Sequence, residues 1–401
     1  MIACVIALTT LLASISAAAE PQIAAPATAK PEATTPTAPA PEMSAPGGPA
    51  PGMPATGMPA PGMPATRYER TEQREPCADY RPLRQPLFGD LHVHTSLSFD
   101  SYISSQRNTP ADAYRYARGE AITLPDADAN QVIKARIQRP LDFTAVTDHA
   151  EFLGPIRLCT SPDSGMARWF PGCIATRSEL FPVQFLAADY WQGLGVSGDE
   201  EVKEQSMVCS LGDCDAAHRE AWQQIQDAAE EHYDRSADCQ FTTFIGYEYT
   251  DAPNFANLHR NVIFRNERVT DIAISTYDTG SRNVPELWRR LRSECIDGDQ
   301  GCDVLAIPHN PNLSAGLMFP DPASEEEARA RLFFEPLVEL VQHKAVSECR
   351  FDRLLGRGVA TEDELCDFEQ APADNEPKQV SQVSNGNGNL GVSHTILLSN
   401  R

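Results

Sequence analysis

The stretch that decides the fold of this 401-residue chain alternates Asp and His with apolar residues: FGDLHVHTS, residues 88–96. Successive side chains of a β-strand point to opposite faces. Asp90, His92 and His94 would therefore share one face, and Leu91 and Val93 the other. The stretch alone fits two readings, a strand that presents three metal ligands and a surface strand with a polar face.

The rest of the chain contains further short apolar runs that read as strands, and they alternate with helix-like stretches. The amphipathic pattern predicts helices over 216–233, 285–295 and 324–334. Strands that alternate with helices are typical of a parallel sheet with helices outside it, so the sequence predicts an α/β fold. The predicted strands are LFGDLHVHT (87–95), LDFTAVTDH (141–149), FTTFIGYEY (241–249), HRNVIFR (259–265), VLAIPHN (304–310) and LVELVQH (337–343).

Most of these strands carry a His or a carboxylate at their carboxyl ends. In a barrel of parallel strands these ends meet at one face, where active sites are built. Ligand sets of His, Asp and Glu without Cys suit Zn, Mn or Fe, and a mixed set suits a site with two or three metals. The agreement of several strand ends favours a metal site over chance. The metal candidates are His92, His94, His149, Glu248, His309 and His343, with His259 as a weaker one.

Single members of this set also have a purely structural reading. His309 precedes Asn-Pro and would fit a turn, and Glu248 would pair with an Arg. His259 would satisfy a loop backbone. His343 precedes Lys344, which is typical of a solvent-exposed position. The joint pattern therefore carries the metal hypothesis.

Composition limits the partners of the protein. The net charge is −23 and the pI is near 4.7, so the surface would repel phosphate backbones and a nucleic-acid partner is not expected. Residues 1–19 read as a signal peptide, with an uncleaved membrane anchor as the alternative. Residues 20–76 are rich in Pro, Ala and Met and read as a disordered spacer.

The ten cysteines after Cys4 are typical of an exported protein in an oxidising compartment, periplasmic or secreted. Sequence alone does not fix the connectivity. Close pairs suggest local bridges, with one long-range pair as the remainder, and the absence of a C-x-x-C pair disfavours a zinc–thiolate site. The suggested pairs are Cys159–Cys173, Cys209–Cys214, Cys295–Cys302, Cys349–Cys366 and Cys77–Cys239.

The motifs GDLHVHTSLSFDS and AVTDHAEFLG resemble the first two motifs of the PHP superfamily, the polymerase and histidinol phosphatase hydrolases. GYEYT, NLHRNVIF and IPHNPN are similar to its later motifs. Within the superfamily, the chain resembles a mainly uncharacterised bacterial branch described as a domain of unknown function. The resemblance implies a distorted (β/α)7 TIM-like barrel over residues 77–369, with an insertion at about 157–215, and metals at the carboxyl ends of the strands.

The resemblance also implies roles for single residues. His92 and His94 would hold one metal, Glu248 would bridge two, and His309 would serve another. In the second motif His149 is the expected ligand, and Asp148 an orienting or proton-moving group. The superfamily ends its metal set with a D-x-H motif, and no such motif follows His343 in this sequence. The barrel is therefore expected to be incomplete at its carboxyl end, and residues 370–401 to be a disordered or truncated tail.

The expected function is an exported metal-dependent hydrolase, most simply a phosphoesterase that attacks a small anionic ester with metal-activated water. Asp148 and His149 are the expected catalytic residues, and Arg157 and Arg260 the expected substrate-binding residues. Two alternatives stay open. One is a metal-binding or scaffold relative that has lost turnover with the last motif. The other is a hydrolase of sulfate esters or amides, because a barrel does not select the substrate.

Overall fold

The computed structural model describes residues 71–81, 83, 85–124, 132–197, 206–254, 256–298, 301–314, 317–342, 345–347, 351–352 and 357–358. The predicted signal peptide, most of the predicted spacer and the tail 370–401 lie outside the described residues. Residues 71–76, which the sequence assigns to the spacer, lie against the loop that precedes the central strand. Glu75 N–H, for example, donates to the carbonyl of Arg235 at 3.3 Å.

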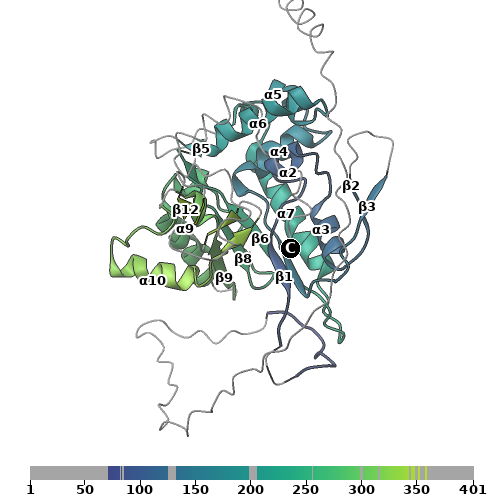
Figure 1. Ribbon diagram of the computed structural model, residues 1–401, viewed down its shortest axis with the longest axis vertical. Helices are drawn as coiled ribbons and strands as arrows, with labels where there is room; N and C mark the ends of the chain where they lie inside the picture. The colour runs from purple at the N-terminus through teal and green to yellow at the C-terminus, as the bar shows by residue number, and fades with distance from the viewer. Residues whose placement is uncertain are drawn as a thin grey trace, which may run out of the picture. The chain divides into compact units, whose positions relative to one another are not determined.

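A curled five-stranded sheet lies at the centre of the fold (Figure 1), and it forms half of a barrel. β1, β4 and β6 run parallel, whereas β8 runs antiparallel to both β6 and β9. The expectation of parallel strands is therefore wrong for β8. Only residues 250–259 join β6 to β8, and a parallel neighbour needs a crossover of about a dozen residues or more. The strands are, in sheet order, β1 (Gly89–Val93), β4 (Phe143–Val146), β6 (Thr242–Tyr249), β8 (Arg260–Phe264) and β9 (Val304–Pro308).

Helices connect the parallel strands. The three predicted helices are confirmed as α7 (Cys214–His232), α9 (Val284–Leu291) and α10 (Glu325–Phe334), and α9 continues as a π-helical turn over Arg292–Ile296. The predicted insertion at 157–215 is largely helical rather than a loop. The other helices are α2 (Phe99–Ile103), α3 (Pro110–Ala117), α4 (Leu153–Thr160), α5 (Pro171–Thr176), α6 (Phe181–Gly195) and α8 (Thr276–Thr279), with 3-10 turns at Ala150–Phe152, Ala167–Trp169, Met207–Ser210 and Pro311–Leu313.

The two faces of the sheet are covered differently. The outer face packs against α3, α7, α9 and α10 in one large apolar core, which includes Trp288 and in which Trp222 contacts Tyr247 and Phe264 of the sheet. The inner face carries a smaller apolar cluster of Leu91, Ala145, Phe244, Ile263, Leu305 and Ile307. The amino acids of each strand thus alternate between the two clusters, as the period of two in a strand requires.

One side-chain hydrogen bond shows how strongly the sheet curls. Asn261 of β8 donates through Nδ2 to the carbonyl of Leu91 in β1 at 3.1 Å. In a flat sheet, three strand spacings would separate these strands by about 14 Å. Because the amide spans the gap directly, β1 and β8 face each other across the inside of the curl.

The described strands do not form the closed seven-stranded barrel that the resemblance implies. The predicted strand 337–343 is reduced to β10 (Val341–Gln342), which pairs with β11 (Ala345–Val346) rather than with the central sheet. Just before it, Glu339 N–H donates to the carbonyl of Pro308 at the end of β9. The described residues form three more two-stranded ladders: β2 (Ile122–Leu124) with β3 (Ile133–Ala135), β5 (Val196–Ser197) with β7 (Ala252–Pro253), and β12 (Phe351–Asp352) with β13 (Arg357–Gly358).

Four of the five suggested disulfides are present: Cys77–Cys239, Cys159–Cys173, Cys209–Cys214 and Cys295–Cys302. The fifth, Cys349–Cys366, lies outside the described residues. Several disulfides in one chain fit an extracytoplasmic protein. In the part of the chain that the structure describes, no helix has both the length and the apolar character needed to cross a bilayer.

Candidate metal centre

Three neighbouring strands lead to one polar site at the same edge of the sheet. In each of them, the row of residues on the inner face ends in a residue with a metal-ligating side chain. Because β8 runs antiparallel, its beginning lies where β6 and β9 end, and this brings the residue just before β8 to the same edge. The rows are Phe244, Gly246 and Glu248 in β6, Ile263, Asn261 and His259 in β8, and Leu305, Ile307 and His309 in β9.

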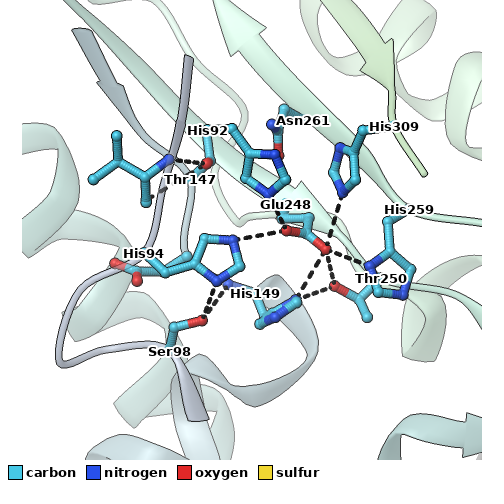
Figure 2. A network of polar contacts seen from close by, with 12 residues as sticks. His92, His94, Ser98, Thr147, His149, Glu248, Thr250, His259, Asn261 and His309 are labelled. Carbon is cyan, nitrogen blue, oxygen red and sulfur yellow. Dashed lines mark hydrogen bonds and ion pairs between the residues drawn. The ribbon is translucent and has the colours of Figure 1, made fainter. Parts of the chain in front are cut away.

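Glu248 is the centre of the site. Its carboxylate is fully buried and lies within ion-pair distance of five imidazoles, as Figure 2 shows. Oε2 lies 3.2 Å from His92 Nε2 and 2.8 Å from His94 Nε2. Oε1 lies 3.2 Å from His149 Nδ1, 2.7 Å from His259 Nδ1 and 3.5 Å from His309 Nε2, in contacts that come from three different strands.

Two further carboxylates, neither of them predicted from the sequence, complete the cluster. Asp100 Oδ2 lies 3.0 Å from His94 Nδ1 and 3.3 Å from His149 Nε2. Glu339 Oε2 lies 2.9 Å from His92 Nδ1. Asp100 is part of the motif GDLHVHTSLSFDS, six residues after His94, and Glu339 lies in the run LVELVQH, so both stood in stretches that the sequence had singled out.

Neighbouring residues hold the ligands in position. The pairing of β4 with β6 continues past β4 to His149 and Glu248, and Glu248 N–H donates to the carbonyl of Asp148 at 3.0 Å. Thr250 Oγ1 lies 2.5 Å from His149 Nδ1 and donates to Glu248 Oε1 at 3.2 Å. Glu151 in turn accepts the backbone N–H of Thr250 at 3.0 Å. The orientation of His149 is therefore fixed by contacts beyond the cluster.

Charges within the site shift its pKa values strongly. Burial alone would raise the pKa of Glu248, but His149, His309 and His259 hold it well below its usual value. Burial alone would lower the pKa of His94 and His149. The carboxylates outweigh it, mainly Asp100 at His94 and Glu248 at His149, and raise these pKa values to about 9 and about 10. Burial, together with the charge of His92, keeps the pKa of His309 well below its usual value.

The donor set fits divalent metal ions. The cluster contains four overlapping groups of three residues, and within each group the three ligand atoms lie within 4.8 Å of one another. Together the groups use His92, His94, Asp100, His149, Glu248, His259, His309 and Glu339. In fully buried His309, Nδ1 has no hydrogen-bond partner among the described residues and Nε2 has only the 3.5 Å contact with Glu248, and an unsatisfied buried group costs about 1–3 kcal/mol. A cation among these nitrogen and oxygen atoms would satisfy them, and the absence of sulfur suits Zn, Mn or Fe.

Asp148 is buried and Asp90 is half-buried near the cluster, but neither belongs to these four groups. Asp148 accepts hydrogen bonds from the N–H and the hydroxyl of Thr95, at 2.6 and 2.7 Å. It thus anchors the segment after β1, while burial raises its pKa to about 6. Asp90 accepts the N–H of His92 at 2.9 Å, and the register of β1 shifts between Asp90 and Val93, so the three residues do not share one face as expected.

The structure does not bring the two expected substrate-binding arginines to the cluster. Arg260 is 2 % exposed and forms an ion pair with Glu335 at 2.5 Å, on the face of β8 opposite to Asn261. Arg157 lies on α4, 3.4 Å from Glu220. Of the expected metal ligands, His92, His94, His149, Glu248, His259 and His309 all meet in the cluster, and His343 lies outside the described residues.

Comparison with known proteins gives a family but no described activity. No curated protein and no solved structure matches the chain. A family model does match, over residues 81–388, and its description is "Protein of unknown function (DUF3604)". The match includes all eight residues of the cluster and the whole central sheet. Because it covers most of the sequence, the chain belongs to the DUF3604 family.

Proposed function

We propose that this protein is an exported, metal-dependent phosphoesterase, periplasmic or secreted, that hydrolyses a small anionic ester with water as the nucleophile. The observation that carries the proposal is the buried Glu248 with five imidazoles and two further carboxylates around it. The order of motifs that resembles the PHP superfamily supports the same reaction class. A protein that needed only structural ion pairs would not collect five histidines around one acid.

The eight clustered residues would hold two or three divalent ions, of Mn, Zn or Fe. Such ions, when bound, lower the pKa of water and offset charge on phosphoryl oxygens. Glu248 lies centrally enough to hold two ions at once. Glu339 supplies a carboxylate beside His92, and this supports metal binding although the sequence lacks the expected D-x-H motif.

A metal-bound imidazole cannot take up a proton, so in this proposal proton transfer belongs to the carboxylate of Asp100, beside His149, rather than to Asp148. His149 lies between Glu248 and Asp100, at the cluster itself. Asp148 is held by two donors from Thr95 and is 0 % exposed, so its carboxylate acts as an anchor. Asp100, whose side chain is 27 % exposed, lies on the more open side of His149, where a proton could pass to solvent.

The net charge of the metal-loaded site explains why the substrate would be an anion although no arginine lies in the site. The three clustered carboxylates contribute −3. Two divalent ions would bring the site to a net charge of about +1, which attracts an anionic ester. The ions would therefore supply the positive charge that was predicted to come from Arg157 and Arg260.

The test is a comparison of metal content and hydrolysis between variants of the full chain. After dialysis we expect two or more equivalents of Mn, Fe or Zn, and hydrolysis of aryl phosphates above that of aryl sulfates. Glu248→Gln should lose both metal and activity, whereas Glu220→Gln, at an exposed glutamate, should lose neither. A protein that binds metal but hydrolyses no ester would have a binding role instead. Faster hydrolysis of aryl sulfates than of aryl phosphates would change the substrate class. A folded protein that binds no metal would refute the proposal.

A further inference from the structure

A pocket of about 170 Å³, separate from the metal cluster, lies between α4, the start of α7 and the segment 272–278. None of the eight cluster residues lines it. For comparison, an engineered cavity of about 150 Å³ is large enough to hold benzene, so the pocket has room for a compact organic molecule. Its charged and ring-bearing polar lining residues are Glu151, Asp215, His218, Arg219, Tyr277 and Asp278, and Ser206 and Ser275 add hydroxyl groups.

His218 gives the pocket a hydrogen-bond acceptor. Its ring bonds to the backbone of Ala273, and its Nε2 is buried with no hydrogen-bond partner among the described residues. Burial also lowers the pKa of His218, so the imidazole is neutral at neutral pH. A neutral imidazole that donates from one nitrogen accepts at the other. The ligand that completes this site is therefore a hydrogen-bond donor.

The charged residues around the pocket determine the sign of the charge that a ligand should carry. Glu151, Asp215 and Asp278 contribute −3 and Arg219 contributes +1, which gives a net charge of −2. Arg290 lies 3.4 Å from Asp278 and offsets one of these charges, so the net value is −1. A cation is favoured on these grounds, and an anion is not.

A metal ion fits this pocket less well than an organic cation. Its acids and His218 do not bring three ligand atoms within 4.8 Å, since the groups that do so in the described residues all lie in the cluster around Glu248. The ring of Tyr277 lines the pocket and favours an organic cation over a hydrated ion. Asp215 and Arg219 lie four residues apart on α7, so one helical face presents the charges.

We propose that this pocket binds a small primary ammonium ion. An N–H group of the ligand would donate to His218 Nε2, and Asp215 and Asp278 would balance its charge. This inference does not depend on the proposed hydrolysis, because it uses no residue of the metal cluster.

The experiment is saturation-transfer NMR on the full chain with butylammonium chloride, and with sodium butyrate as the anion of matched size. We expect transfer to butylammonium and little to butyrate. His218→Leu and Asp215→Asn should each weaken butylammonium binding at least about tenfold. Asp215 is exposed, so its variant tests the proposal even where His218→Leu fails to fold.

The controls are His232→Leu and Asp227→Asn, which change a half-buried and an exposed residue farther along the same helix. Both should bind butylammonium as the parent does. Three results would overturn the proposal: no transfer to butylammonium, butyrate binding that is equal or stronger, or butylammonium binding that Asp215→Asn leaves unchanged. The last result would place the amine elsewhere, for example at the metal ions.

Discussion

At the scale of single residues, Asp100 offers the cleanest test of the metal centre. It contacts both His94 and His149, yet its side chain is 27 % exposed, so its replacement leaves the core intact. Asp100→Asn removes a charge and should lower the affinity for divalent metal by at least about tenfold. Competition with a coloured chelator measures this. Asp227→Asn, on an exposed helical face, is the control and should bind metal normally.

The protonation of His94 and His149 predicts how metal-free protein responds to pH. Their folded pKa values are raised to about 9 and about 10, above the unfolded value near 6.5. Their contribution to stability is therefore complete below about pH 6.5 and is lost as the pH rises through 9 and 10. Asp100 and Glu248 have lowered pKa values, so their contribution is lost only in acid.

The affinity for metal should rise with pH, whereas the stability of the metal-free protein falls, because the ligands must lose their protons before they bind a metal ion. We expect the difference in melting temperature between metal-loaded and metal-free protein to grow from pH 6 to pH 9. Calorimetric titration should also show proton release on binding. A difference that is constant with pH would mean that His94 and His149 are not protonated in the metal-free state.

At the scale of secondary-structure elements, the hydrogen bond between Asn261 and Leu91 should stabilise the curl of the sheet. Asn261 is 1 % exposed, and its loss leaves the Leu91 carbonyl without this donor. Asn261→Ala should lower the free energy of unfolding by about 1–3 kcal/mol. It should also weaken metal binding, since His92 and His309 approach each other only across the curl.

Asn266 provides a matched comparison for that variant. It also donates from Nδ2 to a backbone carbonyl, that of Gly301, but at an exposed site. Asn266→Ala should change stability by less than about 0.5 kcal/mol and leave metal binding unchanged. Equal losses of stability and of metal binding in the two variants would show that the hydrogen bond between Asn261 and Leu91 does not stabilise the curl.

The sequence predicted the strands of the central sheet well, because the apolar period of two and the polar strand ends are local signals. Periodicity does not give strand direction, so the antiparallel β8 was missed, and with it the reason that His259 reaches the site. Asp100 was missed because it belongs to a short helix rather than a strand end. Glu339 was missed because its segment is irregular, which breaks the alternation that pointed to His343 instead.

At the scale of the whole molecule, the disulfides should differ in their effect on stability according to the chain length they close. The separations are 162 residues for Cys77–Cys239, 14 for Cys159–Cys173 and 5 for Cys209–Cys214. Chain entropy alone predicts losses of about 5, 3 and 2 kcal/mol when each pair is replaced by serines. Urea denaturation of the three double variants measures the order, and a reversed order would show that local packing dominates.

The Cys77–Cys239 bridge also has a consequence for access to the protein. Cys239 lies just before β6 begins, whereas Glu248 lies at the other end of that eight-residue strand, about 25 Å away. Thr71 bonds to Glu267 beyond β8, at the same remote edge of the sheet. A solid support or fusion partner attached through the chain ahead of residue 71 should therefore leave the histidine-lined edge open to solution, so immobilised protein should take up metal as readily as dissolved protein.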